Sequence, residues 1–305
     1  MADLDPVLAQ LLAAAPFQLT ADGGPEMARK RFAELPRGEV FPEVTTEDLA
    51  VDGPGGPVPI RVYRPPTDKQ VLPLVIFIHG GAWSFGDIET YESRARLHAV
   101  GVEAVVVAID YRLAPEHPYP AAVEDVWAVT QWVAANAGEL GGDPDRIAVA
   151  GDSAGGNLAA VTAQLARDAG LPLRFQLLWY PSTTFDTSLP SFTENAEAPI
   201  LGLEACKDFT RWYVGDTDMR QPPATLVPAV GDLTGLPPAF ISVAGHDPLR
   251  DDGARYAQLL TEAGVDTELH NADSLVHGFL AYHGLVPAAT EAGDRGIAAL
   301  RNALH

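Results

Sequence analysis

Short apolar runs rich in β-branched residues recur along the chain and alternate with segments of helical periodicity. The apolar runs occupy residues 73–81, 103–112, 145–156, 173–181, 237–245 and 266–273, and the third of them ends in a turn. The helical segments occupy residues 119–140, 157–170, 253–264 and 294–305. Strands that are apolar throughout are typical of a parallel sheet covered by helices on both faces. The pattern therefore predicts an α/β fold with a mostly parallel central sheet.

Two segments do not follow this alternation, and we predict that they form a helical cap. Residues 1–45 begin with an apolar stretch that lacks the basic residues of a secretory signal, which favours a short amphipathic helix and a cytoplasmic protein. Residues 183–222 are rich in proline and aromatic residues. Residues 46–182 and 223–305 then form the core. We expect the cap above the carboxyl ends of the strands, where open α/β sheets bind ligands.

The composition excludes several classes of function. The chain has 305 residues, 41 acidic against 20 basic, and a formal net charge of −21, which disfavours nucleic acid and anionic membranes as partners. No uncharged apolar stretch is long enough for a membrane span. The single cysteine, Cys206, excludes an intramolecular disulfide, and we expect a buried, inert thiol. No His or Cys pair has the spacing of zinc ligands, so we expect neither a metal nor a cofactor.

The motif Gly-Asp-Ser-Ala-Gly at residues 151–155 lies between a predicted strand and a predicted helix, with no room for a loop. Gly151 and Gly155 stand where side chains would collide in so sharp a turn. Such a turn exposes the hydroxyl of Ser153 at the top of the sheet, beside a helix N-terminus. Ser153 is therefore a candidate nucleophile, with Asp152 in a supporting role at most.

A serine nucleophile needs a base and an orienting acid, which follow it in the order Asp, His on this type of sheet. Asp247 comes directly after the strand at 237–245, and Asp251 and Asp252 are alternatives that could instead serve the next helix. His277 lies in the loop after the last strand. Six other histidines fit less well. His98 and His117 precede the serine, His246 adjoins the acid, His270 lies in a strand, His283 in a helix and His305 at the terminus.

An oxyanion hole requires backbone N–H groups aimed at the substrate oxygen. Ala154, directly after the serine, offers one such group. The loop His-Gly-Gly-Ala-Trp at residues 79–83 ends an earlier strand and offers others, since its glycines let the main chain approach the substrate.

The segments HGGAW, DYRLAPEHPYPAA, GDSAGGN, HDPLRDDG and VHGF together resemble the bacterial hormone-sensitive-lipase-like (family IV) esterases of the α/β-hydrolase fold, from about residue 45 onward. The resemblance implies a Ser153, Asp247 and His277 triad. It also implies three oxyanion N–H donors: Gly81 and Ala82, in a loop shaped by Gly80, and Ala154 after the serine. Ala82 departs from the family's third glycine, and we expect the hole to persist if the φ angle of Ala82 is negative. Arg112 and Glu116 are expected to form a structural pair.

The sequence thus predicts a serine carboxylesterase that hydrolyses short- to medium-chain acyl or aryl esters through an acyl-enzyme, as a possible homodimer. We expect five residues to line its substrate pocket: Trp83, Asp152, Phe209, Trp212 and Phe279. Two alternatives are an arylamide deacetylase, which can use the same motifs, and a ligand-binding protein such as the plant gibberellin receptor. That receptor resembles the family but lacks the catalytic histidine, so the presence of His277 favours an enzyme.

Overall fold

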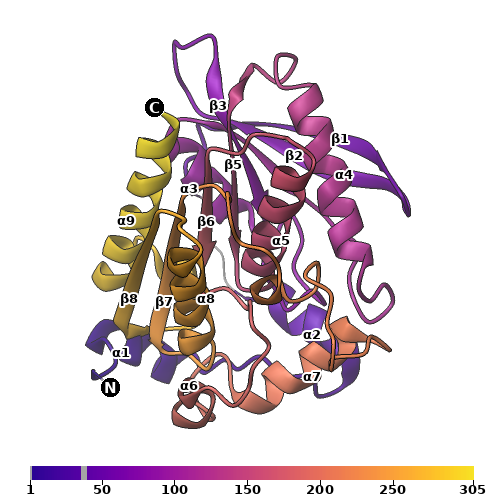
Figure 1. Ribbon diagram of the computed structural model, residues 1–305. Coiled ribbons are helices and arrows are strands. Elements are labelled where there is room, and N and C mark those ends of the chain that lie inside the picture. The colour runs from indigo at the N-terminus through magenta and orange to yellow at the C-terminus, as the bar shows by residue number, and fades with distance from the viewer. Residues whose placement is uncertain (1, 36–39) are drawn as a thin grey trace.

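A computed structural model describes residues 2–35 and 40–305 (Figure 1). Its centre is one eight-stranded sheet with the strand order β1-β2-β4-β3-β5-β6-β7-β8. The strands are β1 (Thr45–Gly53), β2 (Gly56–Arg64), β3 (Leu72–Ile78), β4 (Val105–Ile109), β5 (Gly142–Asp152), β6 (Phe175–Trp179), β7 (Ala239–His246) and β8 (Thr267–Val276). Strands β3 to β8 are parallel, and β1 and β2 are antiparallel to their neighbours. The predicted, mostly parallel α/β sheet is confirmed.

Helices cover both faces of the sheet. They are α3 (Glu92–Val102) and α9 (Pro287–Leu304) on one face, and α4 (Ala121–Ala135), α5 (Ala154–Asp168) and α8 (Arg250–Glu262) on the other. Every residue of β3 is buried, and alternate residues enter different cores: Ile76 packs in the α4/α5/α8 core and Phe77 in the α3/α9 core. Two-sided burial explains why these strands are apolar throughout.

The hairpin of β1 and β2 has no counterpart in the predicted elements. Most residues of β1 are exposed, so its sequence carries acidic and small residues rather than an apolar run. A strand that is solvated on one face and lies at the edge of a sheet gives a weak hydrophobic pattern. The hairpin completes the sheet through the pairing of β2 with β4.

The remaining helices gather at one end of the sheet (Figure 1). They are α1 (Pro6–Ala14), α2 (Gly24–Ala33), α6 (Pro190–Glu194) and α7 (Leu203–Val214); short 3₁₀ turns occur at Pro228–Val230 and Phe279–Tyr282. The two segments that carry them are joined directly, because the Leu19 N–H donates to the Ile200 carbonyl at 2.7 Å. Ala28 of α2 and Phe209 of α7 share a small apolar cluster with Phe85 from the core.

The expected pair of Arg112 and Glu116 is wrong. Arg112 instead forms two hydrogen bonds with the buried carboxylate of Asp125 on α4, from Nε at 2.9 Å and from a terminal nitrogen at 2.8 Å. Glu116 turns outward and accepts a hydrogen bond from Arg29 of α2 at 3.0 Å. The two charges therefore hold two different elements, and Glu116 ties α2 to the core.

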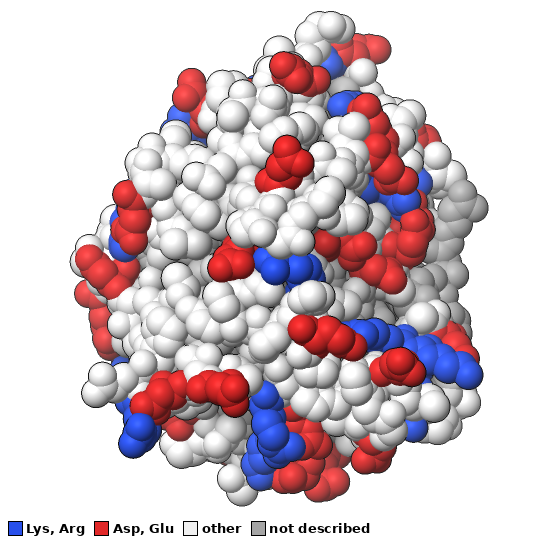
Figure 2. All heavy atoms as spheres, turned by 90° about the vertical axis from the view of Figure 1, so that its right-hand side faces the viewer, with Lys and Arg blue, Asp and Glu red and all other residues white. Residues whose placement is uncertain are grey.

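The surface reflects the acidic composition. On the face in Figure 2, acidic side chains are spread widely, and several of them lie against a basic side chain. The described helices include none whose length and apolar character would let it cross a bilayer.

We expect Arg112→Met to lower the free energy of unfolding by about 3 kcal/mol, because it leaves a buried carboxylate without its cation. The Asp125 side chain is 1% exposed and the Arg112 side chain is 25% exposed. Because the arginine is partly solvated, we expect the loss of stability to lie at the low end of the range for buried ion pairs. Urea denaturation followed by circular dichroism measures the change. The exposed pair of Arg220 and Asp218 provides the control, and Arg220→Met should leave the midpoint where it is. An Arg112→Met variant as stable as the wild type would contradict this account.

We expect the free energy of unfolding to fall as the pH drops from about 6.5 to 4, in part because of His98. Burial lowers the pKa of His98 from 6.5 to about 4, so the unfolded chain binds a proton in this window that the folded protein does not. One such proton contributes a slope of about 1.4 kcal/mol per pH unit. His98→Gln, which cannot titrate, should flatten the slope by about that amount in urea titrations at several pH values. Parallel slopes for the two proteins would show that His98 does not contribute.

Candidate active site

Ser153 lies at a strained turn between β5 and α5, with φ of 55° and ψ of −117°. A Cβ atom on Gly151 would overlap the carbonyl of Gly155, and one on Gly155 would overlap the carbonyl of Ile78 at the end of β3. Both glycines are therefore required by close packing of the backbone. The turn leaves the serine half-buried and lining the main cavity.

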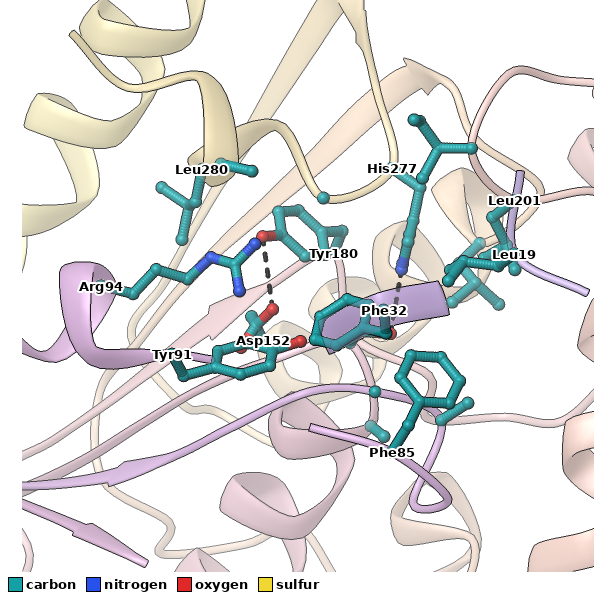
Figure 3. A pocket seen from close by; sticks show the side chains of 18 of the residues that line it. Leu19, Phe32, Phe85, Tyr91, Arg94, Asp152, Tyr180, Leu201, His277 and Leu280 are labelled. Atoms are coloured by element: carbon teal, nitrogen blue, oxygen red, sulfur yellow. Dashed lines mark hydrogen bonds between the residues drawn. The ribbon is translucent and has the colours of Figure 1, made fainter. Parts of the chain in front are cut away.

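Three side chains that follow different strands meet at this turn. The Nε2 atom of His277 lies 2.9 Å from the Oγ atom of Ser153, and its Nδ1 atom lies 2.7 Å from Oδ2 of Asp247 (Figure 3). Asp247 and His277 are both buried. This chain of hydrogen bonds has the geometry in which an imidazole can remove the serine proton while a carboxylate fixes the tautomer.

Of the three candidate acids, only Asp247 forms a hydrogen bond with His277. Oδ1 of Asp247 accepts the N–H of Leu249 at 2.9 Å, which leaves Oδ2 for the histidine. Asp251 accepts the N–H of Ser191 at 2.9 Å, and Asp252 accepts the N–H of Thr183 at 2.7 Å. Asp251 and Asp252 therefore hold the segment that follows β6, and neither contacts His277.

Asn195 is a site residue with no counterpart among the residues predicted from the sequence. It is buried after α6, and its Nδ2 group donates to the carbonyls of Gly245 and Asp247, both at 3.2 Å. Asn195 thereby fixes the loop that carries the acid. No local pattern could have indicated this role, because the contact spans about fifty residues and depends on the fold.

The loop after β3 presents backbone N–H groups beside Ser153. The Gly80 N–H is not available, since it donates to Oδ1 of the buried Asp152 at 3.0 Å. No acceptor within the described residues is recorded for the N–H groups of Gly81, Ala82 and Ala154, the three predicted donors. Their free N–H groups border the cavity at the serine.

The condition that Ala82 has a negative φ angle is not met. Its φ angle is +51°, and the next residue, Trp83, has a φ angle of +55°. Positive values cost a non-glycine residue about 1–2 kcal/mol. Packing supports the strain, because the indole of Trp83 stacks on Tyr213 of α7 with ring centroids 4.2 Å apart. The loop thus keeps the conformation that a third glycine would adopt without strain.

The other buried histidines near the site have structural roles. Burial lowers the pKa of His79 to about 4, and its Nδ1 lies 2.7 Å from the Gly80 carbonyl. The Nε2 atom of His98 accepts a hydrogen bond from the indole of Trp179 at 3.2 Å. Among residues 2–35 and 40–305, no cluster of three or more His, Cys, Asp or Glu side chains is arranged to hold a metal ion.

A cavity of about 830 Å³ opens at Ser153. Its wall includes three of the five predicted pocket residues, Trp83, Asp152 and Phe209. The placement of Trp212 and Phe279 in the wall is wrong for the described cavity, since Trp212 packs behind Phe209 and Phe279 is fully buried against Trp179 and Tyr180.

Cys206 also lines the cavity, where a half-buried position was not expected. Desolvation raises the pKa of its thiol far above the ordinary value, helped by the negative charges of Asp247 and Asp252. The thiol therefore stays protonated and is a poor nucleophile.

Comparison with known proteins places this geometry in a family. Residues 75–281 match the model of a family described as having the alpha/beta hydrolase fold. The chain is 56% identical over 306 residues to the esterase LipI of Mycobacterium tuberculosis (strain ATCC 25618 / H37Rv), covering 99% of this chain and 96% of that protein. It is 56% identical to the carboxylesterase NlhH of the same strain, covering 99% and 97%. The crystal structure of DphMB1 superposes with a TM-score of 0.97 at 64% identity, covering all of both chains.

We expect Ala82→Gly to raise the free energy of unfolding by about 1 kcal/mol or less, because relief of the positive φ angle is partly offset by the greater freedom of glycine in the unfolded chain. Loss of the methyl group from the cavity wall should also raise kcat/KM for 4-nitrophenyl 2,2-dimethylpropanoate relative to 4-nitrophenyl acetate. Urea denaturation and initial rates measure the two effects.

Gly81→Ala is the matched variant on the same loop. Gly81 has a φ angle of +100°, and a Cβ atom there would overlap the Phe85 carbonyl, so the loop would have to move. We expect a loss of roughly 10²-fold in kcat, comparable to the loss of one oxyanion donor. Equal behaviour of Ala82→Gly and Gly81→Ala would refute the assignment of strain in this loop.

Proposed function

The chain belongs to the α/β-hydrolase family, among its hormone-sensitive-lipase-like (family IV) esterases, and from this premise we propose that it is a serine carboxylesterase whose nucleophile is Ser153. The observation that carries the proposal is the continuous chain of hydrogen bonds from Oγ of Ser153 through His277 to Asp247, with both imidazole nitrogens in use. Three free N–H groups beside the hydroxyl complete the machinery for acyl transfer.

Acylation begins when His277 removes the Ser153 proton and Oγ attacks the ester carbonyl. The resulting oxyanion accepts hydrogen bonds from the N–H groups of the oxyanion loop and of Ala154, each contributing on the order of 3 kcal/mol to the stability of the transition state. The protonated imidazole is stabilised by the carboxylate of Asp247 at 2.7 Å. It then protonates the leaving alkoxide, so the alcohol departs and the acyl group stays on Ser153.

Deacylation repeats these steps with water in place of serine. His277 removes a proton from water, the hydroxide attacks the acyl-enzyme, and the free carboxylic acid leaves as Oγ regains its proton. Every proton in the cycle passes through one imidazole, and the residues of the site supply all the groups that the reaction needs.

The cavity supports short- to medium-chain esters as substrates. Its volume of about 830 Å³ lies in the range of small-molecule pockets. Apolar side chains from both helical segments, among them Phe32, Leu201 and Phe209, form much of its wall together with Phe85 of the core. Such a wall favours an alkyl or aryl acyl group over a charged one in most of the cavity.

We further propose the division of the chain into a core, residues 46–182 and 223–305, and a cap, residues 1–45 and 183–222. The contact between Leu19 and Ile200 and the shared apolar cluster support it. We also propose a cytoplasmic location. A homodimer is a further proposal, supported by the position of β8 at an edge of the sheet, where a second copy could pair with it.

We expect the wild-type protein to hydrolyse 4-nitrophenyl esters from acetate to about octanoate, with little activity on palmitate, and Ser153→Ala to abolish the activity. Removal of the nucleophile should lower kcat by ~10⁶-fold, as in other serine hydrolases. Release of 4-nitrophenolate measures the rate. An amide substrate, 4-nitroacetanilide, tests the amidase alternative in the same assay.

Asp247→Asn and Asp251→Asn form a matched pair of variants, because each removes one charge from the stretch that runs from the end of β7 into the first turn of α8. Asp247→Asn should lower kcat by about 10⁴-fold through loss of the correct tautomer. Asp251→Asn should leave the rate within about tenfold, since its partners are Ser191 and Arg250 rather than His277. Full activity in Ser153→Ala, or the reverse order of the two aspartate variants, would overturn the assignment of the triad.

A further inference from the structure

Arg94 places a positive charge in the wall of an otherwise largely apolar cavity. It comes from the first turn of α3 and is half-buried. Figure 3 shows its guanidinium beside Tyr180 and Leu280, on the opposite side of Tyr180 from His277. The charge therefore faces the cavity that holds the reacting serine, but at a different part of its wall.

Apart from a side-chain hydrogen bond with Tyr91, the described residues offer no hydrogen-bond partner to the guanidinium of Arg94. Every other arginine of residues 2–35 and 40–305 forms an ion pair or donates to a backbone carbonyl, whereas neither is recorded for Arg94. Its Nε atom is buried without a hydrogen-bond partner. The guanidinium rests on the ring of Tyr91, with Cζ 4.2 Å from the ring centroid, which orients its plane and leaves its edge open. Buried donors without acceptors are uncommon and costly.

Asp152 is the carboxylate whose charge acts on Arg94, but it does not take up these donors. Its Oδ1 atom accepts the Gly80 N–H at 3.0 Å, and its Oδ2 atom faces the Tyr180 hydroxyl at 3.5 Å. Among the described residues, neither carboxylate oxygen of Asp152 has Arg94 as its hydrogen-bond partner. Burial also raises the pKa of Asp152, which weakens it as a permanent counter-ion.

We propose that Arg94 is the binding site for a carboxylate of the substrate, so that the enzyme takes esters that carry a second, free carboxylate. This inference rests on the proposed esterase function. A guanidinium edge matches a carboxylate with two parallel hydrogen bonds. Leu97 and Leu280 line the cavity near it and suit a short apolar linker between the two groups. In a protein of net charge −21, such a local cation also offsets the general repulsion of an anionic substrate.

The chemistry at the serine is unchanged by the second carboxylate. Water adds across the ester, the C–O bond to the leaving alcohol breaks, and the free carboxylate remains bound as an anion throughout. The carboxylate can belong to the acyl group, as in a half-ester of a dicarboxylic acid, or to the alcohol, as in an acylated hydroxy acid. One substrate pair for each case distinguishes them.

The test compares substrates of similar size with and without the charge. For the acyl side, these are 4-nitrophenyl hydrogen succinate and 4-nitrophenyl pentanoate; for the alcohol side, 4-acetoxybutanoate and pentyl acetate, followed by pH-stat. We expect Arg94→Met to lower the ratio of kcat/KM for the anionic over the neutral ester by roughly tenfold or more in one pair, as for loss of a charge-assisted hydrogen bond. Arg94→Lys should retain part of the ratio.

Arg301→Met is the matched control, because it removes the same charge from an exposed position paired with Glu103, outside the cavity. It should leave both ratios within about twofold of the wild type. Unchanged ratios in Arg94→Met, or equal losses on anionic and neutral esters, would overturn the inference and leave Arg94 as a partner of Asp152 alone.

A binding measurement keeps this inference separate from the proposed function. Calorimetric titration of the Ser153→Ala variant with intact 4-nitrophenyl hydrogen succinate should show binding that weakens roughly tenfold on addition of Arg94→Met. If neutral esters are not hydrolysed, the esterase proposal fails, while this titration still decides the role of Arg94. Equal affinity in the two proteins would refute it.

Discussion

The backbone contact between the turn at Ser153 and the end of β3 is the constraint on which the site depends. Gly151 and Gly155 bring the start of α5 so close to the Ile78 carbonyl that a methyl group has no room. The loop that follows β3 must therefore pass directly beside the serine. This contact explains why the oxyanion N–H groups lie next to the nucleophile, although more than seventy residues separate the two motifs in the sequence. Neighbouring positions of β3 and β5 in the sheet make the contact possible.

Asp247 and His277 also lie beside Ser153, but the loops that carry them cross a greater distance. They follow β7 and β8, which lie at the lateral edge of the sheet opposite the β1–β2 hairpin, so the loops that carry them must extend back toward β5. The segment after β6 stabilises this extension. Asn195 holds the carbonyl of Asp247, and Ser191 donates to the carbonyl of Pro248 at 2.6 Å. The insertion that forms part of the cavity wall thus also positions the acid, and it cannot move freely without affecting the hydrogen bond to His277.

Most of the core could be predicted because its strands are buried on both faces and its motifs are local. The hairpin at Thr45–Arg64 could not, since one-sided burial leaves a mixed pattern. Arg112 was assigned the wrong partner, because Glu116 and Asp125 are both near in sequence and only the docking of α4 selects between them. The positive φ angle of Ala82 could not be predicted, because stacking of Trp83 on Tyr213, a long-range contact, stabilises a conformation that local sterics disfavour. In each case the deciding contact is tertiary.

The oxyanion loop and the cation in the cavity share one electrostatic environment through Asp152. This carboxylate orients the loop by accepting the Gly80 N–H, which directs the next N–H groups toward the serine. A buried carboxylate so close to a developing oxyanion would oppose catalysis if its charge were not balanced. Arg94, whose charge acts on Asp152, supplies that balance without consuming the carboxylate's hydrogen-bonding sites. Because Arg94 offsets the charge of Asp152 without bonding to it, the loop is stabilised and the guanidinium edge stays open to a ligand. One arginine can therefore both offset the negative charge beside the oxyanion hole and bind the carboxylate of the substrate.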